Sequence, residues 1–396
     1  MKIQMKTKAK LSVICQSLLI ALLGLSLTTG CNKQESTSET KKAPAAEKIP
    51  IGSILALTGP AASYGEMMQR GLQLAEGEIN GAGGVNGRPI KIVVEDSQFS
   101  APKAISAFQK LTEIQNIKVI VGITGSKIAL PVAEAAKEGK CVIIDALSTA
   151  PALTERGGRA YFRVIASDAL AGKYNADWAV EEGMKKPALI YVEDEWGASY
   201  RNALQNYLKS KGFNEPLVEG IKAGDRDFRT QIQKIKDNGA DVVFLLTYSN
   251  EGTTFMQQLR QAGLNSKVYG SDNLSSPEFI AAGTSVIEGV RVALPLPTEG
   301  ADYDKFVKSF KAKFGMEPDV NALKSYDALN VAAKGIQQAG LDPIKITQYL
   351  RSPAFSHRGV SGEIRFDQNG DLVSQQYRRL VYRNGALEPV VKAQEK

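Results

Sequence analysis

The chain has 396 residues, of which 43% are hydrophobic and 23% charged, and its formal net charge is +7. Residues 1–30 hold four lysines and no acidic residue, so the remainder carries 45 basic and 42 acidic residues, a net charge of +3. A small net charge with mixed signs argues against a nucleic acid or an acidic polymer as the partner. The length suits two domains or one two-lobed protein.

The first 30 residues have the layout of an exported precursor. Four lysines precede an almost purely apolar run over residues 11–27, and small residues then lead to Cys31. This order is typical of a signal peptide, and a cysteine directly after small residues indicates a lipoprotein signal in which Cys31 is acylated. Thr28 stands where a leucine is usual in such signals. An ordinary signal peptide cut nearby and an uncleaved anchor are therefore the alternatives.

A polar segment follows the signal. Residues 31–48 are rich in Ser, Thr, Glu, Lys and Ala, cannot bury a core, and are predicted to be a disordered tether. No later stretch approaches the 18 or more apolar residues of a membrane span. We therefore expect an exported, membrane-anchored protein that faces the periplasm or the cell exterior.

Cysteine and histidine are too scarce for much enzyme chemistry. Beyond the signal and Cys31 only Cys141 remains, in an apolar run that predicts a buried thiol, and His357 is the single histidine. One Cys and one His cannot build a Cys/His zinc site, and no nucleophile elbow accompanies His357. The sequence thus favours a protein that is not an enzyme and that uses no cofactor or metal.

Short apolar runs alternate with amphipathic stretches along the first part of the chain. Strands are predicted over residues 51–57, 90–95, 119–121 and 141–144. Helices are predicted around Met68, Leu72, Ala75 and Ile79, over residues 101–114, and over residues 129–138. Asn86-Gly87 is a turn signal between the first helix and the second strand.

The same alternation begins again further on. Strands are predicted over residues 188–192, 242–246 and 268–269, and helices over 169–182, at the stripe Phe228, Ile232 and Ile235, and over 254–262. Residues 303–350 are mainly helical, and residues 361–381 are strand-like with a turn at 367–370. Buried strands separated by crossover helices imply parallel sheets. Two such series predict an α/β protein with two Rossmann-like lobes, each with a parallel central sheet.

Three junctions between a strand and the next loop carry candidate binding groups. Ser126 follows the strand ending at residue 121 and begins a helix, where N–H groups and the helix dipole attract an anion. Thr149 follows the strand 141–144 and can donate or accept a hydrogen bond. Asp272 follows a short strand and can pair with an ammonium group. Each residue alone also fits a helix cap or a solvated turn.

Together, several short segments resemble one family. Over about residues 49–391 the chain resembles the type I periplasmic binding proteins of the leucine/isoleucine/valine-binding kind, the solute receptors of ABC importers. The segments that carry the resemblance are Gly59-Pro-Ala-Ala-Ser-Tyr-Gly65, Gly81-Ala-Gly-Gly-Val-Asn-Gly-Arg88, Pro151-Ala-Leu-Thr154, Glu193-Asp-Glu-Trp-Gly197, Asp225-Arg-Asp-Phe228, Gly270-Ser-Asp272 and Ser276-Pro-Glu278. Each is weak alone, and their order and spacing are specific.

The resemblance implies roles for individual residues. Ser126 and Thr149 stand where the family holds the ligand's α-carboxylate through side chain and backbone N–H. Asp272 stands where an acid meets the α-ammonium, helped by the Leu147 carbonyl and the Thr149 hydroxyl. Three aromatic residues stand at pocket positions that wall the side-chain end of the cleft: Tyr64, Trp196 and Tyr248.

The chain also departs from the family. Asp272 is shorter than the Glu of some members, and Trp196 stands where a Tyr is common. A disulfide frequent in the family is absent, since Ser100 and Gly125 stand where its cysteines are expected. The first two departures leave the ligand's identity open.

The resemblance further implies a hinge that the chain crosses three times, near Ala166, Leu294 and Tyr377. Lobe 1 is then residues 49–167 with 294–376, and lobe 2 is residues 168–293 with 377–394. Ligand docks on lobe 1 and the hinge closes. We expect a monomer that binds a small aliphatic amino acid and delivers it to the membrane permease of an ABC importer. The alternatives are a sensory role, or an amide, urea-like or aromatic acid ligand.

Overall fold

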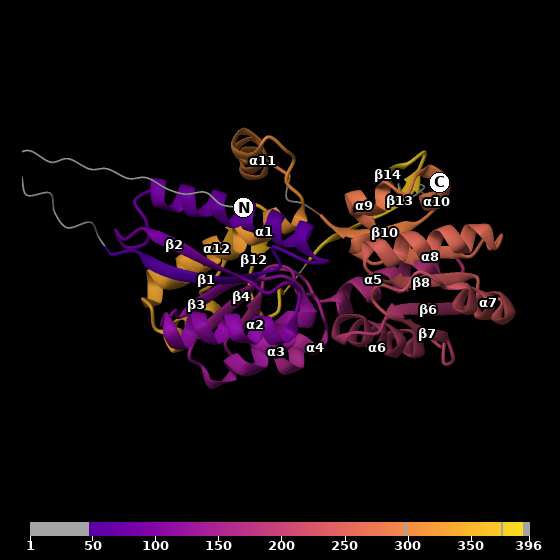
Figure 1. The fold of residues 1–396 in the computed structure, drawn as a ribbon, viewed down its shortest axis with the longest axis horizontal. Coiled ribbons are helices and arrows are strands. Elements are labelled where there is room, and N and C mark those ends of the chain that lie inside the picture. The colour runs from indigo at the N-terminus through magenta and orange to yellow at the C-terminus, as the bar shows by residue number, and fades with distance from the viewer. Residues whose placement is uncertain (1–46, 297–298, 374, 391–396) are drawn as a thin grey trace, which may run out of the picture. The chain divides into compact units, whose positions relative to one another are not determined.

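The structure, a computed structural model, describes residues 47–296, 299–373 and 375–390. These residues contain two large β-sheets, each covered by helices (Figure 1). The predicted signal peptide, Cys31 and nearly all of the predicted tether lie outside the described residues. Within the described part, no helix is both long and apolar enough to cross a membrane.

The first sheet has five parallel strands in the order β2-β1-β3-β4-β5. The strands are β1 (Ile49–Leu55), β2 (Ile90–Asp96), β3 (Val119–Ile123), β4 (Val142–Asp145) and β5 (Tyr161–Arg163). The helices that connect them are α1 (Ala62–Gly81), α2 (Ala101–Gln109) with η1 (Lys110–Ile114), α3 (Ser126–Ala135) with η2 (Ala136–Glu138), and α4 (Ala152–Arg156). Every residue of β3 and β4 is buried. Apolar side chains on both faces explain why these strands are continuous hydrophobic runs.

The second sheet has seven strands in the order β14-β13-β10-β9-β8-β6-β7. Its strands are β6 (Pro187–Val192), β7 (Leu217–Ile221), β8 (Val242–Leu246), β9 (Lys267–Gly270), β10 (Arg291–Pro295), β13 (Tyr377–Arg383) and β14 (Ala386–Pro389). Strands β6 to β10 are parallel, whereas β13 and β14 add an antiparallel hairpin. The helices are α5 (Asp168–Glu181), α6 (Glu195–Ser210), α7 (Arg229–Asn238), α8 (Ser249–Gln261), η3 (Asp272–Ser275), α9 (Pro277–Ile280) and α10 (Thr284–Ile287).

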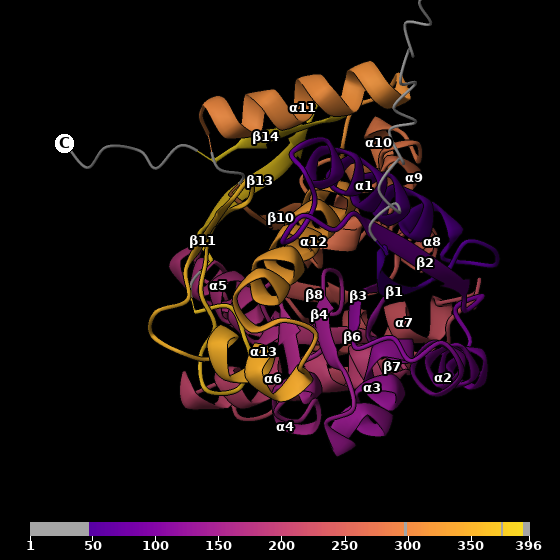
Figure 2. The same ribbon diagram turned by 90° about the vertical axis from the view of Figure 1, so that its left-hand side faces the viewer.

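Three connections join elements of the two sheets. The chain leaves the first sheet after β5, and after β10 it leaves the second sheet. It then forms α11 (Ala301–Phe314), α12 (Val320–Ala339), α13 (Pro343–Leu350), β11 (His357–Gly359) and β12 (Gly362–Ile364). Helix α12 packs against α1, β3 and β4 of the first sheet before the chain enters the second sheet at β13 (Figure 2).

The two sheets of mostly parallel strands confirm the predicted α/β class. Most predicted elements are present, and the differences are local. Helix α8 begins at Ser249, five residues before the predicted start. The predicted helix over residues 101–114 is an α-helix to Gln109 and then a wider π-helical turn. The strand-like tail is two separate strands, β12 and β13, because an isolated bridge and turn interrupt it.

Helix α6 and strand β7 were not predicted from the sequence. Helix α6 has its apolar side chains four residues apart, at Trp196, Tyr200, Leu204 and Leu208, and all four are buried. This spacing was an available helical signal. Strand β7 lies at the edge of the sheet and is only half-buried along most of its length, so it lacks a hydrophobic run.

The close approach of α1 and α12 requires glycine at one position. A Cβ atom on Gly71 would lie 2.1 Å from the carbonyl oxygen of Ala322, on α12. By contrast, a Cβ on Gly77, six residues further along α1, would meet only the flexible Lys313 Nζ, at 3.6 Å. The two glycines share a helix and differ in their surroundings.

We predict that Gly71→Ala lowers the free energy of unfolding by about 1–3 kcal/mol, because the backbones of the two helices must separate. Gly77→Ala is the matched control and should be neutral or stabilising by up to about 1 kcal/mol, since alanine favours a helix. Urea denaturation of both variants measures the difference. Equal effects of the two substitutions would contradict the proposed packing constraint.

Candidate functional site

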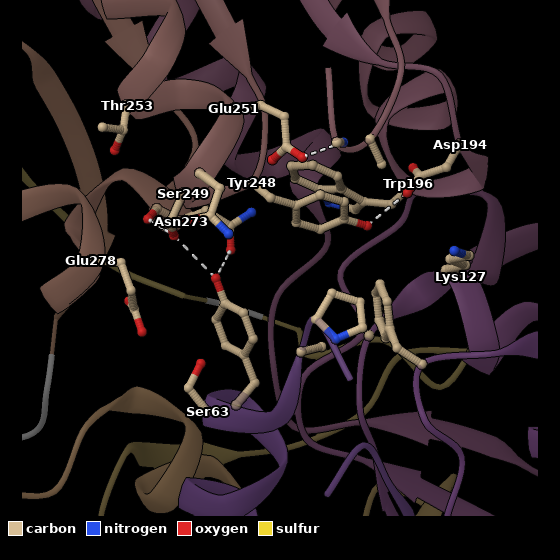
Figure 3. A pocket seen from close by; sticks show the side chains of 18 of the residues that line it. Ser63, Lys127, Asp194, Trp196, Tyr248, Ser249, Glu251, Thr253, Asn273 and Glu278 are labelled. Carbon is tan, nitrogen blue, oxygen red and sulfur yellow. Dashed lines mark hydrogen bonds between the residues drawn. The ribbon is translucent and has the colours of Figure 1, made fainter. Parts of the chain in front are cut away.

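A cavity of about 920 Å³ opens where parallel strands of both sheets end. The strand order reverses beside β1 and β3 in the first sheet and beside β6 and β8 in the second, and ligands bind at such switch points in α/β sheets. All seven predicted site residues line this cavity: Tyr64, Ser126, Leu147, Thr149, Trp196, Tyr248 and Asp272. Figure 3 shows the side chains that converge there.

Ser126 is the first residue of α3 and joins two loops. Gly125 before it has a φ of +86°, which lets the chain turn sharply from β3 into the helix. The Ser126 Oγ accepts a hydrogen bond from the backbone N–H of Ala150 at 3.0 Å. The N–H groups in the first turn of a helix have no partner within that helix, and the helix dipole favours an anion near them. This corner of the cavity can therefore hold a carboxylate.

The loop after β4 is held by a buried carboxylate. Asp145 accepts hydrogen bonds from the backbone N–H groups of Leu147 and Ser148, at 2.9 and 3.2 Å, and from the Tyr161 hydroxyl at 2.7 Å. Burial raises the pKa of Asp145 above its usual range. These contacts fix the backbone of Leu147 at the cavity wall.

A fully buried arginine, Arg163, also supports this loop. Arg163 donates to the carbonyl oxygen of Ala150 at 2.9 Å and to the Thr154 hydroxyl at 2.6 Å. Its Nε also pairs with Asp371 at 2.6 Å. A planar guanidinium with five donors can hold a loop in one geometry in this way.

Thr149 takes part in a hydrogen-bond network that the sequence did not reveal. Its hydroxyl donates to Asp168 Oδ2 at 2.5 Å, and the indole Nε1 of Trp196 donates to the same oxygen at 2.6 Å. The hydroxyl hydrogen of Thr149 is therefore directed at Asp168. Trp196 Nε1 also donates to the Thr149 hydroxyl oxygen, at 3.2 Å. That oxygen can accept one further hydrogen bond from a ligand, which suits an ammonium group better than a carboxylate.

Aromatic rings form one wall of the cavity. Trp196 and Tyr248 stack with centroids 4.9 Å apart, and Figure 3 shows their rings overlying one another. Phe99 meets Tyr248 edge-on at 6.1 Å, and Lys127 Nζ lies 5.2 Å from the Phe99 ring centroid. The Tyr248 hydroxyl donates to Asp194 at 2.7 Å. A continuous aromatic strip is suited to an apolar ligand group.

Tyr64 links α1 to the loops of the second sheet. Its hydroxyl lies 3.2 Å from Ser249 Oγ and donates to Asn273 Oδ1 at 3.5 Å. Burial and nearby carboxylates raise the pKa of Tyr64 to about 12, so the phenol stays neutral. Outside the cavity, Arg156 on α4 pairs with Glu195 on α6 at 2.9 Å.

Asp272 begins η3 directly after β9 and is buried beside the cavity. Burial raises the pKa of Asp272. The charged side chains that line the cavity are mostly acidic: Asp194, Asp225, Glu251, Asp272 and Glu278, against Lys127 and Arg226. This balance favours a ligand that carries a positive group.

Two residues of this site, Asp168 and Phe99, were not predicted from the sequence. Asp168 stands at the start of a predicted helix, where an acid ordinarily needs only the helix dipole as an explanation, so nothing marked it. Phe99 follows Gln98, and both have positive φ, +55° and +52°. Two such residues in a row indicate local strain that often accompanies function, but backbone angles are not visible in a sequence.

His357 and Cys141, the residues that bore on enzyme chemistry, do not line the cavity. Cys141 is a buried free thiol whose pKa burial raises to about 12. Among the described residues, no group of His, Cys, Asp and Glu side chains is arranged to hold a metal ion. The chemistry of the cavity is that of hydrogen bonds and charges.

Residues 48–386 match the family described as periplasmic binding protein. The chain belongs to this family. It is 30% identical over 331 residues to a leucine-, isoleucine-, valine-, threonine- and alanine-binding protein of Pseudomonas aeruginosa, with 83% of this chain and 88% of that protein covered. The predicted resemblance is thereby confirmed, and with it the prediction of a solute-binding protein and not an enzyme.

Solved structures agree with the fold. A leucine-binding protein of Thermotoga maritima superposes with a TM-score of 0.77 at 25% identity, covering 87% of this chain and 98% of that one. A solute-binding protein of an ABC transporter of R. palustris, solved with benzoate, superposes with a TM-score of 0.76 at 22% identity, covering 87% and 96%. These two proteins have similar folds and different ligands.

We predict that Arg163→Met lowers the free energy of unfolding by about 3–5 kcal/mol, because it leaves Asp371 without its buried partner. The double variant Arg163→Met/Asp371→Asn should recover part of that loss. Chemical denaturation of the single and double variants measures the coupling.

An exposed ion pair serves as the control. Arg229 pairs with Asp227 at 2.5 Å, but their side chains are 82% and 59% exposed. Arg229→Met should leave the midpoint of denaturation unchanged, because water screens such pairs. A loss for Arg163→Met no larger than that for Arg229→Met would argue that Arg163 does not support the loop.

Proposed function

We propose that the protein binds a small amino acid with an aliphatic side chain in this cavity, closes around it, and delivers it to the permease of an ABC importer. One observation carries the proposal: the Ser126 hydroxyl, at the start of α3, shares a single cavity with the buried carboxylate of Asp272. An anion-binding helix start and an acid in one cavity are the complement of a zwitterion. The similarity to an aliphatic amino-acid-binding protein of P. aeruginosa supports the same ligand class.

The α-carboxylate would lie at the start of α3. Ser126 offers a hydroxyl and the helix offers N–H groups, and Thr149 contributes its backbone N–H from the neighbouring loop. The α-ammonium would face Asp272, with the Leu147 carbonyl and the Thr149 hydroxyl as further acceptors. The ligand side chain would lie against Tyr64, Trp196 and Tyr248, where apolar surface leaves water.

Closure would involve two lobes. We propose residues 49–167 with 294–376 as lobe 1 and residues 168–293 with 377–394 as lobe 2, with a hinge near Ala166, Leu294 and Tyr377. The three connections between elements of the two sheets support this division. Closure can proceed only as far as the ligand prefers the closed state over the open one. The closed form would be the one that the permease recognises.

The protein would be held at a membrane by its N-terminus. We propose that residues 1–30 are removed, that Cys31 is acylated, and that residues 31–48 act as a tether on a monomeric receptor facing the periplasm or the cell exterior. The name of the matched family supports the compartment.

An aromatic acid is the second candidate ligand. The strip of Phe99, Tyr248 and Trp196 favours it, since stacked rings can hold a planar aromatic group. A relative in fold was solved with benzoate. A receptor for such a ligand could serve import or signalling with the same fold.

We predict that leucine, isoleucine or valine raises the thermal midpoint of the purified protein. A ligand at one hundred times its dissociation constant stabilises the native state by about 2.7 kcal/mol, which should shift the midpoint by roughly 2 °C or more. The panel includes benzoate, 4-methylpentanoate and leucine amide. A shift with benzoate alone would replace the amino acid by an aromatic acid.

Asp272→Asn should abolish the shift caused by amino acids, because the ammonium loses its buried counter-charge. The matched control is Asp302→Asn on α11, where the side chain is 65% exposed and pairs only loosely with Arg358, at 3.5 Å. The control should keep the full shift. Persistence of the shift in Asp272→Asn would argue against Asp272 as the ammonium partner.

We predict that Cys31→Ala moves the protein out of the membrane fraction or leaves it unprocessed, because the acylated residue is lost. Cys15→Ala, within the apolar run of the signal, is the control and should fractionate like the wild type. Cell fractionation and detergent phase partitioning measure the outcome. Unchanged membrane association of a Cys31→Ala protein that has the same size as the wild type would favour an uncleaved anchor.

A further inference from the structure

A second carboxylate lies directly behind the cavity wall. Asp168 is buried, and its Oδ2 accepts hydrogen bonds from Thr149 Oγ1 at 2.5 Å and Trp196 Nε1 at 2.6 Å. Both donors line the cavity, although Asp168 itself does not. The wall that would receive the ammonium is therefore backed by an acid on its far side.

Asp168 and Asp272 belong to neighbouring elements. Asp168 begins α5, and Asn175 of the same helix donates to the carbonyl oxygen of Gly270, two residues before Asp272, at 3.4 Å. Both carboxylates are buried, where little water can stabilise their charges. The charge of Asp272 also acts on Asp168, and two buried carboxylates that interact in this way cannot both ionise without a large free-energy cost.

The other titratable groups that face the pair do not neutralise it. Arg163 on β5 is a nearby cation, but its guanidinium already bonds Asp371 and the carbonyl oxygen of Ala150. Tyr200 on α6 and Tyr377 on β13 also face the pair, and burial raises their pKa values, so both stay neutral. Burial, and to a smaller extent the charge of Asp272, raises the pKa of Asp168 to about 8.

We propose that Asp168 and Asp272 together form the ammonium site, in which the empty protein holds one proton on the pair and an incoming ammonium takes the place of that proton. This inference rests on the proposed function, since it requires a ligand with an ammonium group. Asp168 is a positioning residue, because it acts through the hydroxyl of Thr149 and the indole of Trp196.

The exchange is balanced in atoms and charge. A carboxylic O–H bond of the pair breaks, its proton passes to water, and the ammonium keeps its three hydrogens and forms no covalent bond. The pair carries a charge of −1 while it holds the proton. It carries −2 when that proton has left, and the bound ammonium adds +1. The ammonium site taken alone thus carries −1 both when it is empty and when it holds the ammonium, and the ligand's α-carboxylate is bound apart from it, at the start of α3.

Specificity follows from this exchange. A ligand without a cationic group cannot replace the proton, so binding it would leave the second acid protonated. The pair would therefore select an amino acid over the corresponding simple acid. Because the empty protein holds a proton that the complex lacks, lower pH favours the empty protein and weakens binding.

The test is isothermal titration calorimetry of the purified protein with leucine between pH 6 and pH 8, in two buffers of different ionisation enthalpy. We expect release of nearly one proton per leucine at pH 6 to 7, decreasing toward pH 8. The dissociation constant should fall about tenfold from pH 6 to pH 7, as for any binding that requires one group to ionise. A pH-independent dissociation constant without proton release would overturn the inference and leave the proposed function intact.

Two comparisons assign the proton to the pair. Asp168→Asn keeps an oxygen that can accept from Thr149 and Trp196, so leucine binding by this variant should release no proton and its dissociation constant should not change with pH. Asp302→Asn, the exposed control, should behave like the wild type. Release of a proton by Asp168→Asn at the wild-type level would assign the proton to another group, such as Lys324, whose pKa burial lowers to about 8, and would overturn the inference.

The wild-type protein supplies a readout that needs no variant. 4-Methylpentanoate has the carbon skeleton of leucine without the ammonium, and it should bind more weakly than leucine and release no proton. Equal proton release with both ligands would tie the proton to closure and overturn the inference. Failure of every amino acid to bind at any pH would refute the proposed function, and this inference with it.

Discussion

Buried negative charge is the constraint on which the organisation of the cavity depends. Asp145, Asp168 and Asp272 all lie at or just beyond the ends of strands, and burial raises the pKa of each. Each is stabilised differently. Asp145 accepts hydrogen bonds from backbone N–H groups, and Asp168 accepts hydrogen bonds from the Thr149 hydroxyl and the Trp196 indole. Asp272 has hydrogen bonds with backbone groups, and it lines the cavity. Asp272 is therefore the acid best placed to take a cation from a ligand, which is the physical reason that this end of the cavity suits an ammonium group.

The predicted site residues that line the cavity could be recognised in the sequence, but the buried carboxylate behind them, Asp168, could not. Ser126, Thr149 and Asp272 were recognisable because they follow apolar strands, and the carboxyl ends of parallel strands meet at one edge of a sheet. Asp168 also contacts this wall, through Thr149 and Trp196. It follows no strand that the periodicity revealed, because β5 has only three residues. A residue at a helix start, such as Asp168, that contacts a site only through other side chains has no hydrophobic periodicity around it that would mark it in the sequence.

The α/β class could likewise be predicted from hydrophobic runs, whereas the edges of the sheets could not. The central strands β3, β4 and β8 are buried throughout, so each is a continuous apolar run. Strand β7, at one edge, and β14, at the other, are mostly half-buried or exposed, and their sequences carry little pattern. Register and edge pairing depend on neighbours far away in the chain, and hydrophobic periodicity does not report them.

One of the connections between the two sheets contains a buried cation, the ammonium group of Lys324. Lys324 on α12 donates to the carbonyl oxygen of Val164, just after β5, and to Gln375, just before β13, at 2.9 and 3.3 Å. It also donates to the Ser361 hydroxyl at 3.1 Å. The backbone N–H of Ser361 in turn donates a hydrogen bond to Asp327. One ammonium group thus ties together two of the three segments that join elements of the two sheets. Because a buried ammonium keeps its charge only while these acceptors surround it, the arrangement of those segments and the charge of Lys324 depend on each other. The same rule governs the cavity, where the proposed ligand would supply a cation beside the buried carboxylate of Asp272.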